Sequence, residues 1–312
     1  MGLNCTSLLS CKAAALIFCL VAAHGSRAQG YAEGIGLSYE LLPLQFKNDS
    51  ATNFRANIFR ANIFRANSIV PIPLGHDSTQ SLLAGANLEL LDFSGSRPGF
   101  GVAAVYGFSP ILGYRRRLSP KTELTALALP ALNSDLRDVR GEDLTWGGVV
   151  RGTYRANARL LYRLTLGYRQ QFYGPQYILL LGLDWQPAPR WRVFGDLPNT
   201  LTISYAVASK VNVGFNLIGI NTAYRLQVQD RYLQYKQGHF GLFAETYLSP
   251  HWALRTTVAY SATRRIDVFA KDAQWPATLD YIGLGKAPTP LSPDIEKGLA
   301  FRLSLSYRVP MR

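Results

Sequence analysis

Beyond its first 28 residues the chain contains no cysteine and no long hydrophobic run. All three cysteines, Cys5, Cys11 and Cys19, lie in that opening segment. If the segment is removed, the remaining chain can form no disulfide, no thiolate metal site and no cysteine nucleophile. Past Ala28, no stretch approaches the ~20 apolar residues that a membrane-spanning helix requires. Anchoring by a transmembrane helix is therefore excluded.

Catalytic and metal-binding motifs are missing as well. The sequence has no His-x-x-x-His, no His-Glu-x-x-His and no acidic calcium loop, so it predicts neither a metal nor a cofactor. The histidines after residue 28 are His76, His239 and His251. A barrel lipid hydrolase would need a Ser-His pair with an orienting Asn or Asp, and only His239 lies near the expected loop side. We predict that the protein is not an enzyme, with lipid hydrolysis as the minor alternative.

The opening segment has the organisation of an export signal. Lys12 is the only charge before an apolar run over residues 13–23, and Ser26 and Ala28 supply small residues at the −3 and −1 positions of a cleavage site. We predict a signal peptide over residues 1–28 and a single outer-membrane β-barrel domain over residues 29–312. Export without disulfides agrees with a closed, hydrogen-bonded barrel in a lipid bilayer.

Alternation of apolar and polar residues is the clearest pattern in the sequence. Between Leu299 and Val309 every second residue is apolar, and the residues between them are mostly arginine or serine. A period of two is typical of a strand with one apolar and one polar face. The same alternation occurs in residues 34–41, 160–169, 201–208 and 252–261. We predict an all-β fold, an antiparallel transmembrane β-barrel of about twelve strands, roughly ten to fourteen, in the bacterial outer membrane.

Short turns and longer polar segments separate the predicted strands. Proline-rich or small-residue turns, which we assign to the periplasmic end, lie at residues 119–121, 186–190, 197–199, 208–210 and 249–251. Longer polar stretches, which we assign to the extracellular end, lie at residues 45–54, 92–99, 133–143, 227–238 and 271–297.

Positive charge is spread along the predicted strands. The formal net charge is +13, and removing Lys12 and Arg27 with the signal leaves +11. The charges that the alternation places in the lumen are Arg115, Arg117, Arg163, Arg169, Arg255, Arg302 and Arg308, with the acids Glu40, Glu89, Asp184 and Glu245. A lumen with excess positive charge predicts a passive pore with a weak preference for anionic solutes. The alternative is a closed barrel filled by these ion pairs, with a structural or surface-binding function in its extracellular loops.

The expected partners follow from the membrane location. They are outer-membrane lipids, the phosphates of lipopolysaccharide and the barrel-assembly machinery, and an exported chain of this kind is not expected to bind nucleic acid. The oligomeric state stays open.

A five-residue repeat lies within residues 54–67. Phe-Arg-Ala-Asn occurs at residues 54–57, 59–62 and 64–67. An odd period sends successive copies to opposite faces of a strand, so we interpret the repeat as a short tandem duplication in or beside the first long loop.

The central segment contains a block of short motifs: Tyr173-Gly174-Pro175-Gln176, the segment 181–187, Trp191-Arg192-Val193 and Leu197-Pro198. This block resembles a family of uncharacterised bacterial outer-membrane β-barrel proteins that is classified only as a domain of unknown function, and the resemblance is clearest over residues 162–224. It implies the barrel and the outer membrane, but no substrate and no catalytic residue. The pattern of the block predicts a hairpin in which Asp184 pairs with an arginine such as Arg192. Interfacial aromatics are expected at Trp185, Trp191, Trp252 and Tyr307.

Overall fold

The computed structural model describes residues 31–46, 59–75, 79–94, 102–227 and 230–310. Apart from one short 3-10 helix, η1 (Gly141–Asp143), its regular elements are β-strands. They are β1 (Tyr31–Leu44), β2 (Phe59–Leu74), β3 (Gln80–Ser94), β4 (Ala104–Arg117), β5 (Thr122–Ala128), β6 (Ala131–Ser134), β7 (Leu144–Thr145), β8 (Gly147–Asn157), β9 (Leu160–Gln171), β10 (Gly174–Ala188), β11 (Trp191–Leu197), β12 (Thr200–Ala208), β13 (Val211–Leu226), β14 (Arg231–Tyr247), β15 (Trp252–Ala270), β16 (Ala277–Leu279), β17 (Ile282–Leu284) and β18 (Gly298–Pro310).

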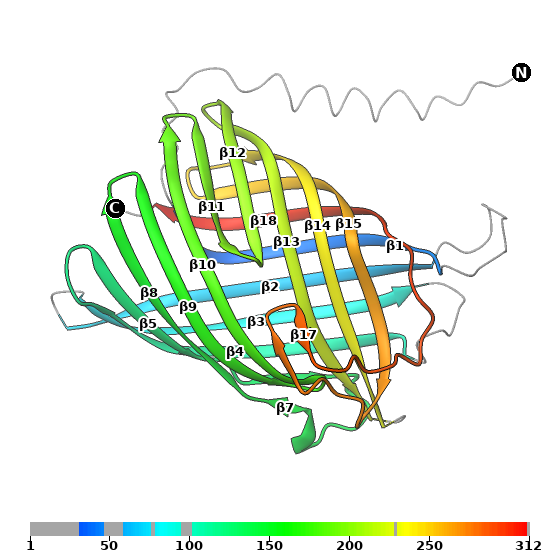
Figure 1. The fold of residues 1–312 in the computed structure, drawn as a ribbon. Helices are drawn as coiled ribbons and strands as arrows, with labels where there is room; N and C mark the ends of the chain where they lie inside the picture. The colour runs from blue at the N-terminus through cyan, green and yellow to red at the C-terminus, as the bar shows by residue number, and fades with distance from the viewer. Residues whose placement is uncertain (1–30, 47–58, 76–78, 95–101, 228–229, 311–312) are drawn as a thin grey trace, which may run out of the picture.

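The strands close into one antiparallel barrel (Figure 1). β18 pairs with both β15 and β1, which joins the last strand to the first. β5 with β6, and β7 with β8, each form one interrupted wall strand, while β16 and β17 form a small hairpin between β15 and β18. Of the eighteen strand segments, subtracting two for the interruptions and two for the hairpin leaves fourteen wall strands. The expected count of about twelve is therefore wrong, although fourteen lies at the upper limit of the expected range, because strand interruptions and the seven-residue β11 weaken the alternation on which that count depended.

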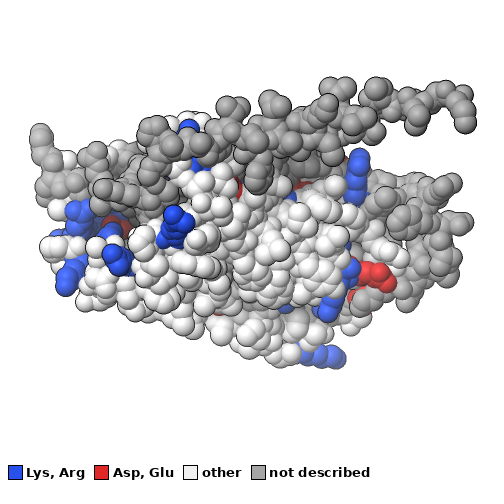
Figure 2. Space-filling model, turned by 90° about the horizontal axis from the view of Figure 1, so that it is seen from above, with Lys and Arg blue, Asp and Glu red and all other residues white. Residues whose placement is uncertain are grey.

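The outer face of the barrel is apolar, as the alternation predicts. Ile35, Leu37, Leu164, Leu166 and Leu303 are all exposed, whereas the residues beside them in the same strands are less exposed or buried. Figure 2 shows a surface on which most described charged atoms lie toward the left and right of the view, with largely uncharged atoms between them. A closed barrel with an apolar outer belt exposes neither polar side chains nor unpaired strand edges to lipid.

The two ends of the barrel differ in the length of their connections. Residues 118–121, 158–159, 189–190, 209–210 and 248–251 make tight turns at one end, to which both chain termini of the sheet also belong. The sequence places the turn at residues 197–199 at this end, and this prediction is wrong: the turn lies at the opposite end, because one strand, β11, separates it from the turn at residues 189–190. The expected loop over residues 227–238 is also wrong beyond Asp230, since Arg231 already begins β14. We call the ends periplasmic and extracellular, following loop length.

Apolar side chains fill the interior at the extracellular end. One buried cluster joins β1, β2, β3 and β4 to β13, β14 and β15. β4 and β13 are seven wall strands apart in either direction around the barrel, yet a Cβ atom on Gly107 of β4 would lie 3.4 Å from the ring of Tyr224 on β13. The members of this apolar cluster include Leu42, Ile63, Leu91, Val105, Tyr224, Leu226, Leu233, Tyr235 and Ile266. The lumen is therefore closed by hydrophobic packing at this level.

Three sequence expectations concern segments that the structure does not describe in full. The predicted signal peptide and His76 lie outside the described residues, as does the first copy of the repeat. The second and third copies form part of β2, beside the first long loop. There Phe64 is exposed on the outer face, and Arg65, the next residue, makes ion pairs on the inner face.

No helix in the described part of the chain is long and apolar enough to span a bilayer.

Candidate functional site

The interior toward the periplasmic end is lined by arginines that share carboxylates. Glu245 on β14 is buried and lies between Arg255 on β15 and Arg308 on β18. Arg255 donates a hydrogen bond of 2.7 Å from Nε to Glu245, and Arg308 donates bonds of 2.7 and 2.6 Å to its two oxygens. The three strands are neighbours in the wall, so this contact is set by register. One carboxylate is thus shared by two guanidinium groups.

A second carboxylate is shared in the same way on the other side of the barrel. Arg163 on β9 lies 2.9 Å from Asp196 on β11, and Arg151 on β8 lies 3.4 Å from the same carboxylate. Arg163 also donates to the carbonyl of Gly195 at 3.0 Å. The side chain of Arg151 stays 35% exposed, so this group meets solvent in the lumen. Two arginines and one carboxylate together carry one net positive charge.

A third network surrounds Glu40 of β1, which is fully buried. Arg302 of β18 and Arg65 of β2 donate hydrogen bonds to it at 2.9 and 3.1 Å, and Arg65 also bonds Glu89 of β3 at 2.7 Å. Gln237 of β14 adds a bond of 3.2 Å to the other oxygen of Glu40. Two arginines and two acids balance here, so this network is neutral and fills the interior just below the apolar cluster.

The other charges predicted to line the lumen lie in different surroundings. Asp184 and Arg192 form a two-pronged pair with bonds of 2.9 and 2.7 Å, which is the pairing that the sequence predicts. Arg115 bonds the hydroxyl of Ser81 and lies 4.0 Å from Glu123. Arg169 is half-buried, and its Nε has no hydrogen-bond partner among the described residues. Arg117 is exposed at the end of β4, beside a periplasmic turn.

The histidine considered for catalysis lies on the inner face of the barrel. His239 is buried, with its Nδ1 atom 3.4 Å from the hydroxyl of Ser261 and its Nε2 atom 3.2 Å from Glu40. These are the residue types of a hydrolase triad, and the sequence did not single out Ser261. However, Ser261 is fully buried and its hydroxyl accepts a hydrogen bond from Gln237, so it presents no nucleophile to a substrate. Glu40, His239 and Ser261 therefore belong to the buried polar network that packs the barrel interior.

His251 lies elsewhere, in the turn between β14 and β15, where its Nδ1 atom is 3.1 Å from the carbonyl of Arg308. In the described residues, no group of three or more His, Cys, Asp or Glu side chains is placed to hold a metal ion.

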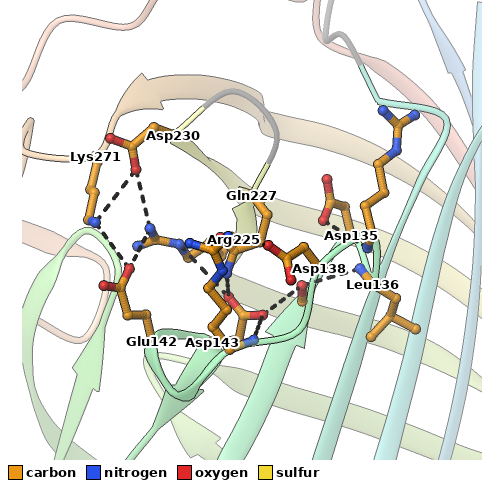
Figure 3. Close-up of polar contacts among 12 residues, drawn as sticks. Asp135, Leu136, Asp138, Glu142, Asp143, Arg225, Gln227, Asp230 and Lys271 are labelled. Carbon is orange, nitrogen blue, oxygen red and sulfur yellow. Dashed lines mark hydrogen bonds and ion pairs between the residues drawn. The ribbon is translucent and has the colours of Figure 1, made fainter.

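A charged cluster joins the extracellular connections (Figure 3). Arg225, at the end of β13, contacts Glu142 at 2.6 Å, Asp230 at 3.2 Å and the buried Asp143 at 3.8 Å. Lys271 lies 3.0 Å from Glu142 and 3.5 Å from Asp230. A hydrogen bond from Lys271, followed by the charge of Arg225, lowers the pKa of Glu142 below its usual value. We call Glu142, Asp143, Arg225, Asp230 and Lys271 the extracellular clasp. These contacts hold the η1 segment against the ends of β13 and β15.

The four aromatics predicted at a membrane interface all lie near the periplasmic turns. Trp185 and Trp191 flank the turn between β10 and β11 and are both exposed. Trp252 and Tyr307 are cross-strand partners on β15 and β18, with ring centroids 5.3 Å apart.

Sequence reasoning missed Arg65, Arg151 and Asp196, which are central to the ion pairs. Arg65 lies in the five-residue repeat, whose odd period obscured the alternation. Asp196 lies in β11, a strand of seven residues next to a proline, and short strands give a weak periodic signal.

The closed antiparallel wall, its apolar outer face and its charged interior define the class of protein. This is the architecture of a bacterial outer-membrane β-barrel protein. The chain belongs to the family described as "Domain of unknown function (DUF6268)", whose model matches residues 105–275, more than half of the chain. The match includes the segment whose motifs indicated an uncharacterised outer-membrane barrel family.

Solved structures of outer-membrane channels have a similar arrangement of strands at very low sequence identity. The toluene transporter TodX of Pseudomonas putida is 10% identical, with 90% of this chain and 91% of that chain covered and a TM-score of 0.42. Pseudomonas putida OprB is 7% identical, with 90% and 94% covered and a TM-score of 0.41. The porin NanC is 8% identical, with 88% and 100% covered and a TM-score of 0.36. No curated protein sequence matches the chain.

Proposed function

We propose that the protein is an outer-membrane channel for small solutes with a weak preference for anions. The observation that carries this proposal is the sharing of Asp196 by Arg151 and Arg163, which leaves positive charge on the inner wall. Arg169 adds a further interior cation, whose Nε atom has no hydrogen-bond partner among the described residues. Fixed positive charge beside water raises the local concentration of anions and lowers that of cations.

The conformation described here is closed at its extracellular end by the apolar cluster. We therefore propose that the channel conducts only when this packing loosens, and that the wild-type protein conducts in brief openings. In this proposal, residues 29–312 form the mature barrel after cleavage of a signal peptide. Outer-membrane lipid surrounds it with Trp185, Trp191, Trp252 and Tyr307 at the periplasmic interface. Lipopolysaccharide and the barrel-assembly machinery are its proposed partners.

The experiment is the reversal potential of the refolded mature chain in a planar bilayer under a salt gradient. We expect an anion-selective potential in the wild type, a shift toward cations in Arg163→Glu, and a shift toward anions in Asp196→Asn. Arg140→Glu changes the same charge in an exposed connection and should leave the potential unchanged. Equal potentials in Arg163→Glu, Asp196→Asn and the wild type would refute the role of the interior arginines.

A closed barrel whose function lies in its loops is the second candidate. The contact of β4 with β13 across the interior favours it, because an apolar cluster of this kind resembles a protein core more than a passage. The same bilayer measurement separates the two. A folded barrel changes its mobility on a gel when it is heated, so this change shows that the refolded protein is folded. If such protein gives no conductance in the bilayer, the result favours the closed barrel.

A further inference from the structure

The periplasmic turns that the structure describes in full carry basic side chains and no acidic ones. Residues 117–122, 154–160, 186–191, 206–211 and 247–252 contain no Asp or Glu. Every Lys and Arg side chain in them is exposed, and none makes an ion pair with another described residue. We call these side chains the basic rim: Arg117, Lys121, Arg155, Arg159, Arg190 and Lys210.

The acids nearest to these turns already have partners of their own. Glu123 is the register partner of Arg117, but it lies 4.0 Å from Arg115. Asp184 is paired with an arginine of β11 at 2.7 Å, and Glu245 is shared by two arginines of β15 and β18. These carboxylates therefore do not neutralise the charge of the basic rim.

Backbone hydrogen bonds join the turns of the rim into one row from β4 to β14. The carbonyls of Lys121, Arg159, Arg190 and Lys210 each accept a bond of 2.8 Å from an amide at the next turn along the wall. Neighbouring strands lie about 4.8 Å apart, so successive turns bring these charges close together. Figure 2 shows basic atoms gathered at the left of the view, the side on which the turns between β4 and β5 and between β8 and β9 lie in Figure 1.

The long extracellular connections that the structure describes have the opposite balance of charge. Residues 133–143 and residues 271–297 each contain more Asp and Glu than Lys and Arg. Several of their charges are paired within the extracellular clasp, as in the contacts of Lys271 with Glu142 and Asp230. The two ends of the barrel therefore differ in charge, and the row of unpaired cations lies at the periplasmic one.

The rim lies at the level of the lipid headgroups. Arg190 directly precedes Trp191, which is exposed, and interfacial tryptophan rings lie at the headgroup level. The turn at residues 189–190 is too short to carry its charge far beyond that ring. Just before the rim, Arg116 is exposed on the same outward face of β4 as Leu112 and Tyr114. Its alkyl stem lies beside lipid, and its guanidinium group extends toward the headgroup phosphates.

We propose that the basic rim binds phospholipids with negatively charged headgroups, such as phosphatidylglycerol, in the periplasmic leaflet of the outer membrane. Lys and Arg at a membrane surface attract anionic headgroups, and a guanidinium group donates two parallel hydrogen bonds to a phosphate. The short turns favour lipid over a more distant periplasmic partner, because they hold the charges beside the interfacial rings. The inference does not depend on an anion-selective passage, since Arg159 and Arg190 lie in turns outside the interior ion-pair networks.

The test measures quenching of tryptophan fluorescence by brominated phospholipids in vesicles that contain the purified protein. The chain has five tryptophans, and Trp146→Phe with Trp275→Phe removes the two at the extracellular end. The three that remain lie near the periplasmic turns, so they report lipid bound at that end whichever way the barrel inserts. Brominated phosphatidylglycerol is compared with brominated phosphatidylcholine, each diluted with unbrominated phosphatidylcholine. The ratio of the two binding constants is the preference for the anionic headgroup.

The variants are made in this tryptophan background. Arg159→Gln with Arg190→Gln removes two charges of the rim. Arg137→Gln with Lys286→Gln removes two exposed charges from the extracellular connections and is the matched control. We expect a preference for phosphatidylglycerol in the parent, a loss of that preference by about fivefold or more in the rim variant, and no change in the control.

A second rim variant, Lys121→Gln with Lys210→Gln, should lower the preference as well, and it keeps the test decisive if the first variant does not fold. Equal binding of the two lipids by the parent overturns the proposal. Equal loss in the rim and control variants also overturns it, because the effect would then belong to net charge. If the rim variants keep the lipid preference but no longer sediment with insoluble peptidoglycan, the rim binds the cell wall and the proposal is wrong. Absence of anion-selective conductance counts against the channel alone and leaves the lipid result standing.

Discussion

The buried carboxylate of Glu40 provides the sharpest test of how the interior is held together. We consider Glu40→Gln, which keeps the side-chain size and removes the charge. Glu40 accepts hydrogen bonds from Arg302 and Arg65, and its side chain is fully buried. In the variant, Arg65 keeps its bond of 2.7 Å to Glu89, but Arg302 loses the only carboxylate that contacts it in the described structure.

The size of the effect follows from this asymmetry. Breaking a buried ion pair by removing one partner costs about 3–5 kcal/mol, because the other charge stays buried without compensation. Only one of the two arginines loses its acid, and the glutamine carbonyl still accepts a hydrogen bond. We therefore expect the free energy of unfolding to fall by about 3 kcal/mol, roughly two orders of magnitude in the unfolding constant.

The measurement is reversible urea unfolding of the barrel in lipid vesicles. Glu40→Gln combined with Arg302→Met removes both charges, so we expect it to recover about half of the lost stability or more. Asp138→Asn, in the exposed pair with Arg140, is the control and should leave the unfolding midpoint unchanged. A loss below about 1 kcal/mol in Glu40→Gln, as for an exposed pair, would refute the reasoning. So would a double variant whose loss equals the sum of the two single losses.

The remaining predictions concern the closure of the extracellular end, the clasp and the buried serine. Ile63→Ala removes a fully buried side chain from the apolar cluster, so it should lower the free energy of unfolding, measured in urea, by about 2–5 kcal/mol. The same variant should lengthen channel openings in single-channel records. Because the pKa of Glu142 is lowered, the clasp is stabilised above the ordinary pKa of a glutamate and loses that stabilisation as the pH falls through the lowered value. Limited proteolysis should thus cleave residues 135–146 faster in acid than at neutral pH, and Glu142→Gln should remove this difference. Ser261→Ala should leave phospholipid hydrolysis at the level of a blank membrane, as in the wild type; a fall in hydrolysis from a measurable wild-type rate would contradict the packing role of His239 and Ser261.

The sequence predicted interior ion pairs only where the two partners are close together in the chain. Asp184 and Arg192 are eight residues apart across one tight turn, so alternation and turn length were enough to bring them together. Arg302 and Glu40 are separated by 262 residues, and their contact depends on which strands close the barrel. The same closure brings Gln237 and His239 to Glu40. No local pattern specifies such a neighbour, because register in a closed sheet is set by every strand at once.

Alternation with a period of two determined by itself that the strands have one apolar and one polar face, because side-chain direction in a strand is a local property. Together with the predicted export signal it predicted a barrel with an apolar outer face. Net charge and the spacing of arginines likewise indicated a positively charged interior. Only the tertiary structure decided the number of wall strands, since β5 with β6 and β7 with β8 are continuous only through their pairing. It also decided that apolar side chains from β4 and β13 meet across the lumen, and that the β16–β17 hairpin pairs with β10. These features join segments far apart in the chain, and their geometry exists only once the barrel has closed.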